Sequence, residues 1–154
     1  MRIVGIDPGV TGALAFMVDG SLVDVIDMPI GDTRVAGWEI ASALQDMLPD
    51  VVVVENTQPM PKNGSVPSFK LGLNTGIVLG VVQTLSLPLV RIRPVDWKRS
   101  NGLVGKDKNA SRYLASELWP GFKDKFKLVK HDGRAEAALI ARAHVIRNVQ
   151  QASA

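Results

Sequence analysis

Apolar and polar positions alternate along the chain in two different periods, which predict strands first and helices later. Short apolar runs rich in β-branched residues predict five strands, at residues 1–7, 14–18, 22–28, 51–54 and 87–92. Asp19-Gly20 lies between the second and third runs and is a strong hairpin turn. Residues 51–54 are consecutive valines, which is typical of a strand buried on both faces.

Helical spacing of apolar residues predicts helices at residues 34–48, 68–85, 109–118 and 132 to about 150. In the first, Val35, Trp38, Ala41, Leu44 and Leu48 share one face. Three strands in a row are followed by alternating strands and helices, which indicates a mixed α/β fold. We expect a single domain over residues 1–154, with a mixed five-stranded sheet of three antiparallel and then parallel strands, flanked by helices.

Four acidic residues stand at the ends of these elements. Asp7 ends the first strand and Glu55 follows the buried fourth one, while Asp132 and Glu136 lie four apart at the start of the last helix. Functional sites of α/β sheets gather beyond the carboxyl ends of strands, and carboxylates suit Mg²⁺ or Mn²⁺. Taken singly, each acid also has an ordinary structural explanation, such as a turn, a strand end or a helix cap.

The charge of the chain is unevenly distributed, although its formal net charge is only +3. Residues 1–60 hold two basic and nine acidic side chains, and residues 61–154 hold sixteen basic and six acidic ones. The alternatives are a chance of surface composition and a surface for a polyanion beside a cluster of acids. There are no cysteines, which excludes a disulfide scaffold, a cysteine zinc finger and a thiol nucleophile.

Two basic segments are candidates for phosphate contacts. Lys98, Arg99, Lys106 and Lys108 surround two glycines, where a flexible backbone can approach a phosphate closely. The lysines of residues 123–130 alternate with other side chains, which fits an extended DNA-binding arm or a sheet edge guarded by lysines.

Three motifs resemble the RuvC-type Holliday-junction resolvases, in the same order along the chain. They are Gly5-Ile6-Asp7-Pro8-Gly9-x-Thr11-Gly12, the segment from Glu55 through Pro61-Lys62-Asn63 to Leu71-Gly72, and Asp132-Gly133-Arg134-Ala135-Glu136 with the helix that follows. The chain looks most like the short bacteriophage members of that family.

The resemblance implies an RNase H-like fold and a homodimer that makes paired nicks across a four-way junction, with other branched DNA as a possible substrate. It implies two Mg²⁺ ions per active site, replaceable by Mn²⁺, held by Asp7, Glu55, Asp132 and Glu136. It also makes Lys62, Lys98, Arg99, Lys106 and Lys108 candidate DNA contacts, and the glycines at 72, 76 and 80 a candidate dimer interface.

The chain departs from the family at its last motif. The family commonly ends its set of acids with two aspartates three apart, whereas here the last acid is a glutamate and the spacing is four. His131 is therefore a rival for the third ligand position.

Two other functions stay open at this point. One is a protein that binds branched DNA without cutting it, and the other is a phosphate-loop ATPase-like domain, for which a second glycine-rich loop is missing. The start of the chain has no signal-peptide pattern, and the apolar stretch at 77–82 is too short for a bilayer. We therefore expect a cytoplasmic protein, in the host cytoplasm if it is phage-encoded, with no membrane partner and with any helicase partner unknown.

Overall fold

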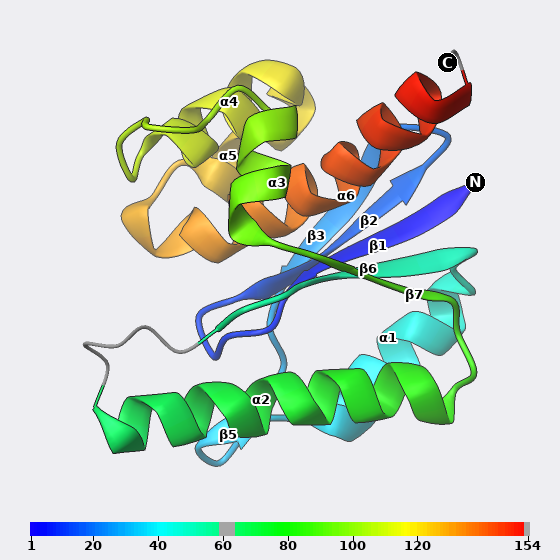
Figure 1. Ribbon diagram of the computed structural model, residues 1–154, viewed down its shortest axis with the longest axis vertical. Helices are drawn as coiled ribbons and strands as arrows, with labels where there is room; N and C mark the ends of the chain where they lie inside the picture. Colours follow the sequence, from blue (N-terminus) through cyan, green and yellow to red (C-terminus); the bar gives the residue numbers. More distant parts are fainter. Residues whose placement is uncertain (59–63, 153–154) are drawn as a thin grey trace.

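The computed structural model describes residues 1–58 and 64–152, and a five-stranded sheet lies at its centre (Figure 1). Its strands are β1 (Arg2–Asp7), β2 (Ala13–Val18), β3 (Ser21–Asp27), β6 (Val51–Glu55) and β7 (Leu89–Ile92). They lie in the order β3-β2-β1-β6-β7, with β1 antiparallel to β2, β2 antiparallel to β3, and β6 parallel to both β1 and β7. The predicted mixed five-stranded α/β fold is confirmed.

The hairpin between β2 and β3 forms at the predicted turn. Asp19 and Gly20 both have positive φ, 48° and 81°. Positive φ at both central residues is the geometry that lets a two-residue turn follow the twist of its strands.

Helices cover both faces of the sheet (Figure 1). One face carries α1 (Gly37–Met47) and α2 (Ser65–Thr84), and the other carries α3 (Pro94–Ser100), α4 (Ala110–Leu118), α5 (Lys123–Phe126) and α6 (Asp132–Ala152). Two short strands, β4 (Ile30–Gly31) and β5 (Arg34–Val35), form a separate hairpin before α1. Two 3-10 turns, Pro120–Phe122 and Val129–His131, flank α5.

Alternating residues of the central strands supply the two cores. Ile3 and Val53 face α6, and Val4 and Val52 face α1 and α2. The α6 side is packed unusually closely: a Cβ added at Gly5 would lie 2.3 Å from the Ala137 carbonyl oxygen. Small residues on both elements thus bring α6 directly onto β1.

The predicted helix at 34–48 has the wrong start and the wrong buried face. It begins at Gly37, because Val35 belongs to β5 and its N–H donates to Asn74 Oδ1 of α2 at 3.2 Å. Ile40 and Leu44 are buried, whereas Trp38 is 75% exposed. The hairpin sets the direction in which the helix enters, and this turns Trp38 outward.

The lysine-rich segment at 123–130 is helical, so the predicted extended arm or sheet edge is wrong. Phe126 is buried and its ring lies 6.2 Å from that of Trp119. Lys125 Nζ donates to Asp24 Oδ1 at 2.6 Å. The aromatic side chain anchors a single helical turn to the core, which the alternating charges of the sequence conceal.

Helix α2 begins three residues before its predicted start and has a largely exposed surface. By length and composition alone it is long and apolar enough to cross a membrane, which is weak support for a span, and its best window is 22% buried. Val78 and Val82 of α2 pack in the core under the sheet. A Cβ added at Gly72, Gly76 or Gly80 would meet nothing within 4 Å, so no described part of the chain packs tightly against the glycine ridge.

Candidate active site

Asp7 and Glu55 lie side by side at the carboxyl ends of β1 and β6. The register pairs Ile6 with Val54, and each acid is the next residue of its strand. Burial, with a further contribution from the Glu55 charge, raises the pKa of Asp7 from 3.8 to about 6, and the Gly9 N–H, 3.4 Å from Asp7 Oδ1, opposes this rise. The predicted pairing of these two acids at one edge of the sheet is observed.

Glu55 is buried, and one side chain donates a hydrogen bond to it. The indole Nε1–H of Trp97 in α3 donates to Glu55 Oε1 at 2.7 Å. Burial raises the pKa of Glu55, while this hydrogen bond and the Lys98 charge lower it. Glu55 therefore has one carboxylate oxygen fixed by the protein and one that no described side chain contacts through a hydrogen bond.

Glu136 comes from the first turns of α6 and joins these two acids. Burial raises its pKa from 4.5 to about 7, and the Asp7 and Glu55 charges contribute next. The helix reaches this position because Gly133 touches the loop after β1, where an added Cβ would lie 2.2 Å from the Thr11 carbonyl oxygen. The first and last sequence motifs thus meet through a glycine.

Asp132 is placed differently from the other three acids. Its side chain is 40% exposed, and Oδ1 accepts a hydrogen bond from Arg112 Nε at 2.6 Å. The Arg112 side chain is only 8% exposed and also donates to the Lys127 carbonyl oxygen at 3.3 Å. Asp132 is therefore an ion-paired acid at the rim of the site.

His131, the rival for the third ligand position, is buried among groups other than the acids of the site. Its Nδ1 accepts a hydrogen bond from the Leu128 N–H at 3.2 Å. Burial lowers its pKa, and the charged groups that act on it are Arg134, Lys130, Asp27 and Arg112. Asp7, Glu55 and Glu136 are not among them, so the structure does not bring His131 to the acids.

A polar pocket of about 400 Å³ opens next to Glu136 and Asp132. Its lining includes three of the predicted DNA contacts, Lys98, Lys106 and Lys108. Arg99, by contrast, is 69% exposed and pairs with Asp96 at 3.3 Å on the surface of α3. Lys62 lies outside the described residues. The pocket therefore combines cations that suit phosphates with the acids of the site.

The acids fit a hard divalent cation in their chemistry. Within residues 1–58 and 64–152, no three Asp, Glu or His side chains form a ready-made ligand set. Over the same residues, however, Asp7, Glu55 and Glu136 have no ion-pair partner, and the Asp7 and Glu55 charges act on Glu136. Mg²⁺ binds proteins through one or two carboxylates and keeps several of its waters, so it does not need a complete set of protein ligands.

Two of three comparisons with known proteins find similarity to Holliday junction resolvases. No known family model matches the chain. The chloroplastic Holliday junction resolvase MOC1 of Chlamydomonas reinhardtii is 34% identical over 89 residues, which are 57% of this chain and 10% of that protein. Thermus thermophilus RuvC, solved in complex with a Holliday junction substrate, has a TM-score of 0.68 at 20% identity and covers 97% of this chain and 96% of its own.

The chain has the RuvC fold. A second Thermus thermophilus RuvC structure gives a TM-score of 0.67 over 98% of this chain. The yeast mitochondrial Holliday junction resolvase Ydc2 gives 0.60 at 17% identity, over 99% of this chain and 80% of its own. The RNase H-like fold expected from the three motifs is thus confirmed.

Two residues near the acids of this RuvC fold were not predicted to act there. The basic pattern of the sequence singles out Lys98 and Arg99, but neither their neighbour Trp97 nor Arg112. A tryptophan next to a candidate DNA-binding lysine, in a helix opened by Pro94, was the available signal for the first. Nothing in the local sequence marks Arg112 as the partner of Asp132, because twenty residues separate them.

Proposed function

We propose that the chain is a metal-dependent endonuclease that nicks four-way DNA junctions, with other branched DNA as a wider substrate class. The observation that supports this most strongly is the meeting of Asp7, Glu55 and Glu136 from β1, β6 and α6 with no ion pair to any of them within residues 1–58 and 64–152. Buried carboxylates that repel one another are costly to ionise, and a bound cation would offset that cost. Since the fold is shared with junction resolvases, we infer that such a cation would assist the cleavage of a DNA phosphodiester.

The roles of the residues follow from their placement. Asp7, Glu55 and Glu136 would hold two Mg²⁺ ions, with Asp132 as an outer ligand at the rim. Bound divalent cations would activate a water and stabilise the leaving oxygen of a phosphodiester. The protein itself orients the carboxylates and, through its pocket, presents the scissile phosphate beside them.

The lysines of the pocket would hold that phosphate. Lys98 is partly buried and its charge lowers the pKa of both Glu55 and Glu136. Lys106 and Lys108 line the same pocket and are exposed. Long cations on an exposed segment are suited to backbone phosphates, which position DNA without reading its sequence.

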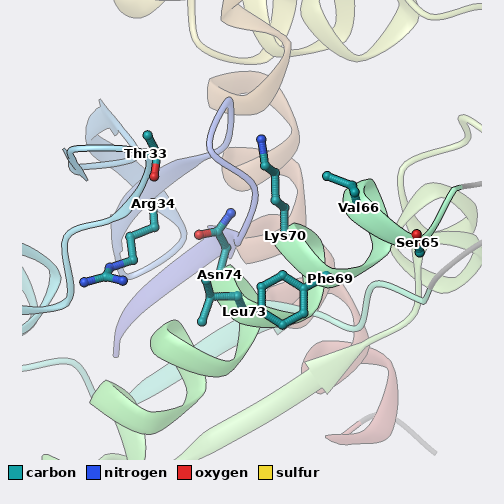
Figure 2. A pocket seen from close by; sticks show the side chains of 8 residues that line it. All are labelled: Thr33, Arg34, Ser65, Val66, Phe69, Lys70, Leu73 and Asn74. Atoms are coloured by element: carbon teal, nitrogen blue, oxygen red, sulfur yellow. The ribbon is translucent and has the colours of Figure 1, made fainter.

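A homodimer would supply the second nick, with α2 as its interface. Phe69 is 70% exposed and Val66 63%, and the uncovered glycine ridge follows them along the same helix. Figure 2 shows Phe69 and Leu73 next to each other on α2, beside a pocket of about 360 Å³ that Arg34 of the β4–β5 hairpin also lines. Two nicks related by a two-fold axis need two copies of the active site.

Sedimentation velocity tests the dimer. Phe69→Asp is expected to shift a dimer to monomer, because a charge would be buried in the interface. Val23→Asp, at an exposed apolar residue of β3 on the far edge of the sheet, is the control and should leave the dimer intact. A wild-type protein that sediments as a monomer, both free and on junction DNA, would contradict the proposal.

A nicking assay on a synthetic four-way junction tests the proposed activity. Wild-type protein should make paired nicks with Mg²⁺, none with EDTA, and few on linear duplex of the same sequence. Asp7→Asn and Glu55→Gln should each lose cutting by about 1,000-fold or more, since each removes several kcal/mol of metal-dependent stabilisation. Both variants should keep their affinity for the junction, because DNA binding depends mainly on basic side chains that contact phosphates.

The alternatives give different results in the same assay. A protein that only binds branched DNA would retain the junction without any Mg²⁺-dependent nick. An ATPase-like domain would release phosphate from ATP and leave the junction whole. The cytoplasmic location stays a prediction.

A further inference from the structure

Trp97 contacts both parts of the chain that carry the acids, one through its side chain and the other through its backbone. The indole of Trp97 is fully buried and donates to Glu55 Oε1 at 2.7 Å. The backbone carbonyl oxygen of Trp97 accepts a hydrogen bond from Asn101 Nδ2 at 2.8 Å, and the same amide group donates to the Leu139 carbonyl oxygen of α6 at 3.0 Å. Asn101 Oδ1 in turn accepts from Arg142 Nη1 at 2.7 Å.

These contacts form one continuous chain from β6 to α6. Glu55 lies at its start, and Leu139 is three residues beyond Glu136 on the helix at its end. Trp97 and Asn101 are both buried, and four residues separate them across the end of α3. The indole holds Glu55, and the backbone of the same residue is tied to α6 through Asn101, so these buried contacts fix one acid relative to the helix of another.

The indole also selects which oxygen of Glu55 is available. An indole has one N–H and no acceptor, so it fixes a single carboxylate oxygen and leaves the other free. Lys98 Nζ lies 5.2 Å from the centre of the same ring, which places a cation against the indole on the side of the pocket. A phenylalanine at position 97 would keep part of the packing and remove the donor.

We propose that Trp97 is a positioning residue for the metal site, which presents one oxygen of Glu55 to the cation and holds Glu55 in register with Glu136. The inference rests on the proposed function, because it presumes that Glu55 binds a divalent ion. Removing hydrogen-bond partners of metal-ligating carboxylates typically weakens metal affinity by about 10- to 100-fold. The expected effect is therefore on metal binding in the absence of DNA and of turnover.

Mn²⁺ titration calorimetry of the full chain, without DNA, tests this role. Trp97→Phe should weaken the tightest Mn²⁺ site by about tenfold or more. Phe126→Leu is the matched control, since it shortens another large, buried aromatic side chain of the same core cluster and should leave Mn²⁺ affinity unchanged. Glu55→Gln should abolish the site while retaining an acceptor for the indole.

A second variant separates the donor from the packing. The benzothienyl analogue of tryptophan at position 97 keeps the fused ring and replaces its N–H by sulfur, so it should bind Mn²⁺ as weakly as Trp97→Phe. A spectroscopic readout comes from the double variant Trp38→Phe/Trp119→Phe, which retains only Trp97 of the three tryptophans of the chain. Its emission should change on adding Mg²⁺, and this change should disappear with Glu55→Gln.

The outcomes of these measurements distinguish a failure of the role of Trp97 from a failure of the proposed metal-dependent function. Wild-type affinity in both the phenylalanine and the benzothienyl proteins would overturn the role of Trp97 and leave the metal site standing. If wild type binds no Mn²⁺, or if Glu55→Gln binds it normally, the metal site itself is wrong. If Trp97→Phe does not fold, the benzothienyl protein decides.

Discussion

The acids beside the pocket divide into two groups that the sequence alone does not separate. Asp7, Glu55 and Glu136 are drawn together from three elements and have no ion-pair partner within residues 1–58 and 64–152. Asp132 is one turn of α6 away from Glu136, yet it is half-exposed and pairs with Arg112 at 2.6 Å. Surface acids of the same face behave like Asp132: Arg134 Nε donates to Asp27 at 2.5 Å.

The comparison identifies the acids whose ionisation lowers the stability of the folded protein. The ion pair between Asp132 and the buried arginine satisfies both groups, so a structural role is enough to account for Asp132. Asp7, Glu55 and Glu136 have no such explanation, because burial raises the pKa of all three and neighbouring carboxylates raise the pKa of Asp7 and Glu136 further. Such a cost is typical of functional sites, where a ligand removes it.

The largest effect on stability is expected from pH and from Asp7. A carboxyl group whose pKa is higher in the folded state binds its proton more tightly when folded, so the free energy of unfolding falls as pH rises through that range. For Asp7, raised from 3.8 to about 6, the window is pH 4 to 6, and Glu136 extends it to about 7. At pH 7.5 in EDTA, Asp7→Asn should be more stable than wild type by about 3 kcal/mol.

Urea unfolding of wild type and Asp7→Asn between pH 3 and 8 measures this difference in the free energy of unfolding. The difference should approach zero below pH 3.8, where Asp7 is protonated in both the folded and the unfolded protein, and it should shrink at pH 7.5 with saturating Mg²⁺. Asp132→Asn is the matched control with the opposite sign: it should be less stable than wild type by about 1–2 kcal/mol, because Arg112 is left without a charged partner. Equal changes in the free energy of unfolding of the two variants would contradict the distinction between the unpaired acids and Asp132.

The packing of Gly133 against the loop after β1 is expected to have the next largest effect. A Cβ at Gly133 would lie 2.2 Å from a backbone carbonyl oxygen, so Gly133→Ala has to move the start of α6. We expect the free energy of unfolding to fall by about 1–3 kcal/mol. Gly121→Ala, where an added Cβ meets nothing within 4 Å, is the control.

Displacement of α6 should also disturb the unpaired acids more than the paired one. Gly133→Ala is therefore expected to weaken Mn²⁺ binding in calorimetry, while Gly121→Ala is not. Unchanged Mn²⁺ affinity in a folded Gly133→Ala protein would show that Glu136 is not held in place by this glycine.

The smallest effect concerns the lysines and the salt dependence of DNA binding. Removing one side chain that binds a phosphate should reduce the slope of log affinity against log salt by about 0.9. Lys98→Ala and Lys108→Ala should each show this reduction, because both line the pocket. Arg99→Ala should not, because Arg99 is paired with Asp96 on the outer side of α3. Equal slopes for all three would mean that the lysines are solvated surface.

The sequence predicted those parts of the fold that depend on local pattern. The valine run indicated β6 and the Asp19-Gly20 turn indicated the β2–β3 hairpin, and Asp7 and Glu55 were each expected at the end of a strand. The pairing of β1 with β6, which makes these two strand ends neighbours, is a finding of the structure. The sheet, its strand directions and the long helices followed from periodicity and from the resemblance to the resolvases.

The features that the sequence did not predict depend on interactions between distant residues. Trp38 was placed on a buried face because helical spacing does not reveal how the β4–β5 hairpin turns α1. Lys125 was placed in an extended arm because its partner Asp24 is about a hundred residues earlier. The same limit hid Arg112, so the sequence treated Asp132 and Glu136 as equivalent.

Nicking of a synthetic four-way junction by Glu136→Gln and Asp132→Asn, each in Mg²⁺ and in Mn²⁺, tests the central claim most directly. The claim is that the unpaired acids hold the metal and the paired acid assists from the rim. Glu136→Gln should be inactive with either ion, whereas Asp132→Asn should retain activity in Mn²⁺, which is the more accommodating ion. If Glu136→Gln cuts normally and Asp132→Asn or His131→Ala is inactive, the metal ligands have been assigned to the wrong residues of α6.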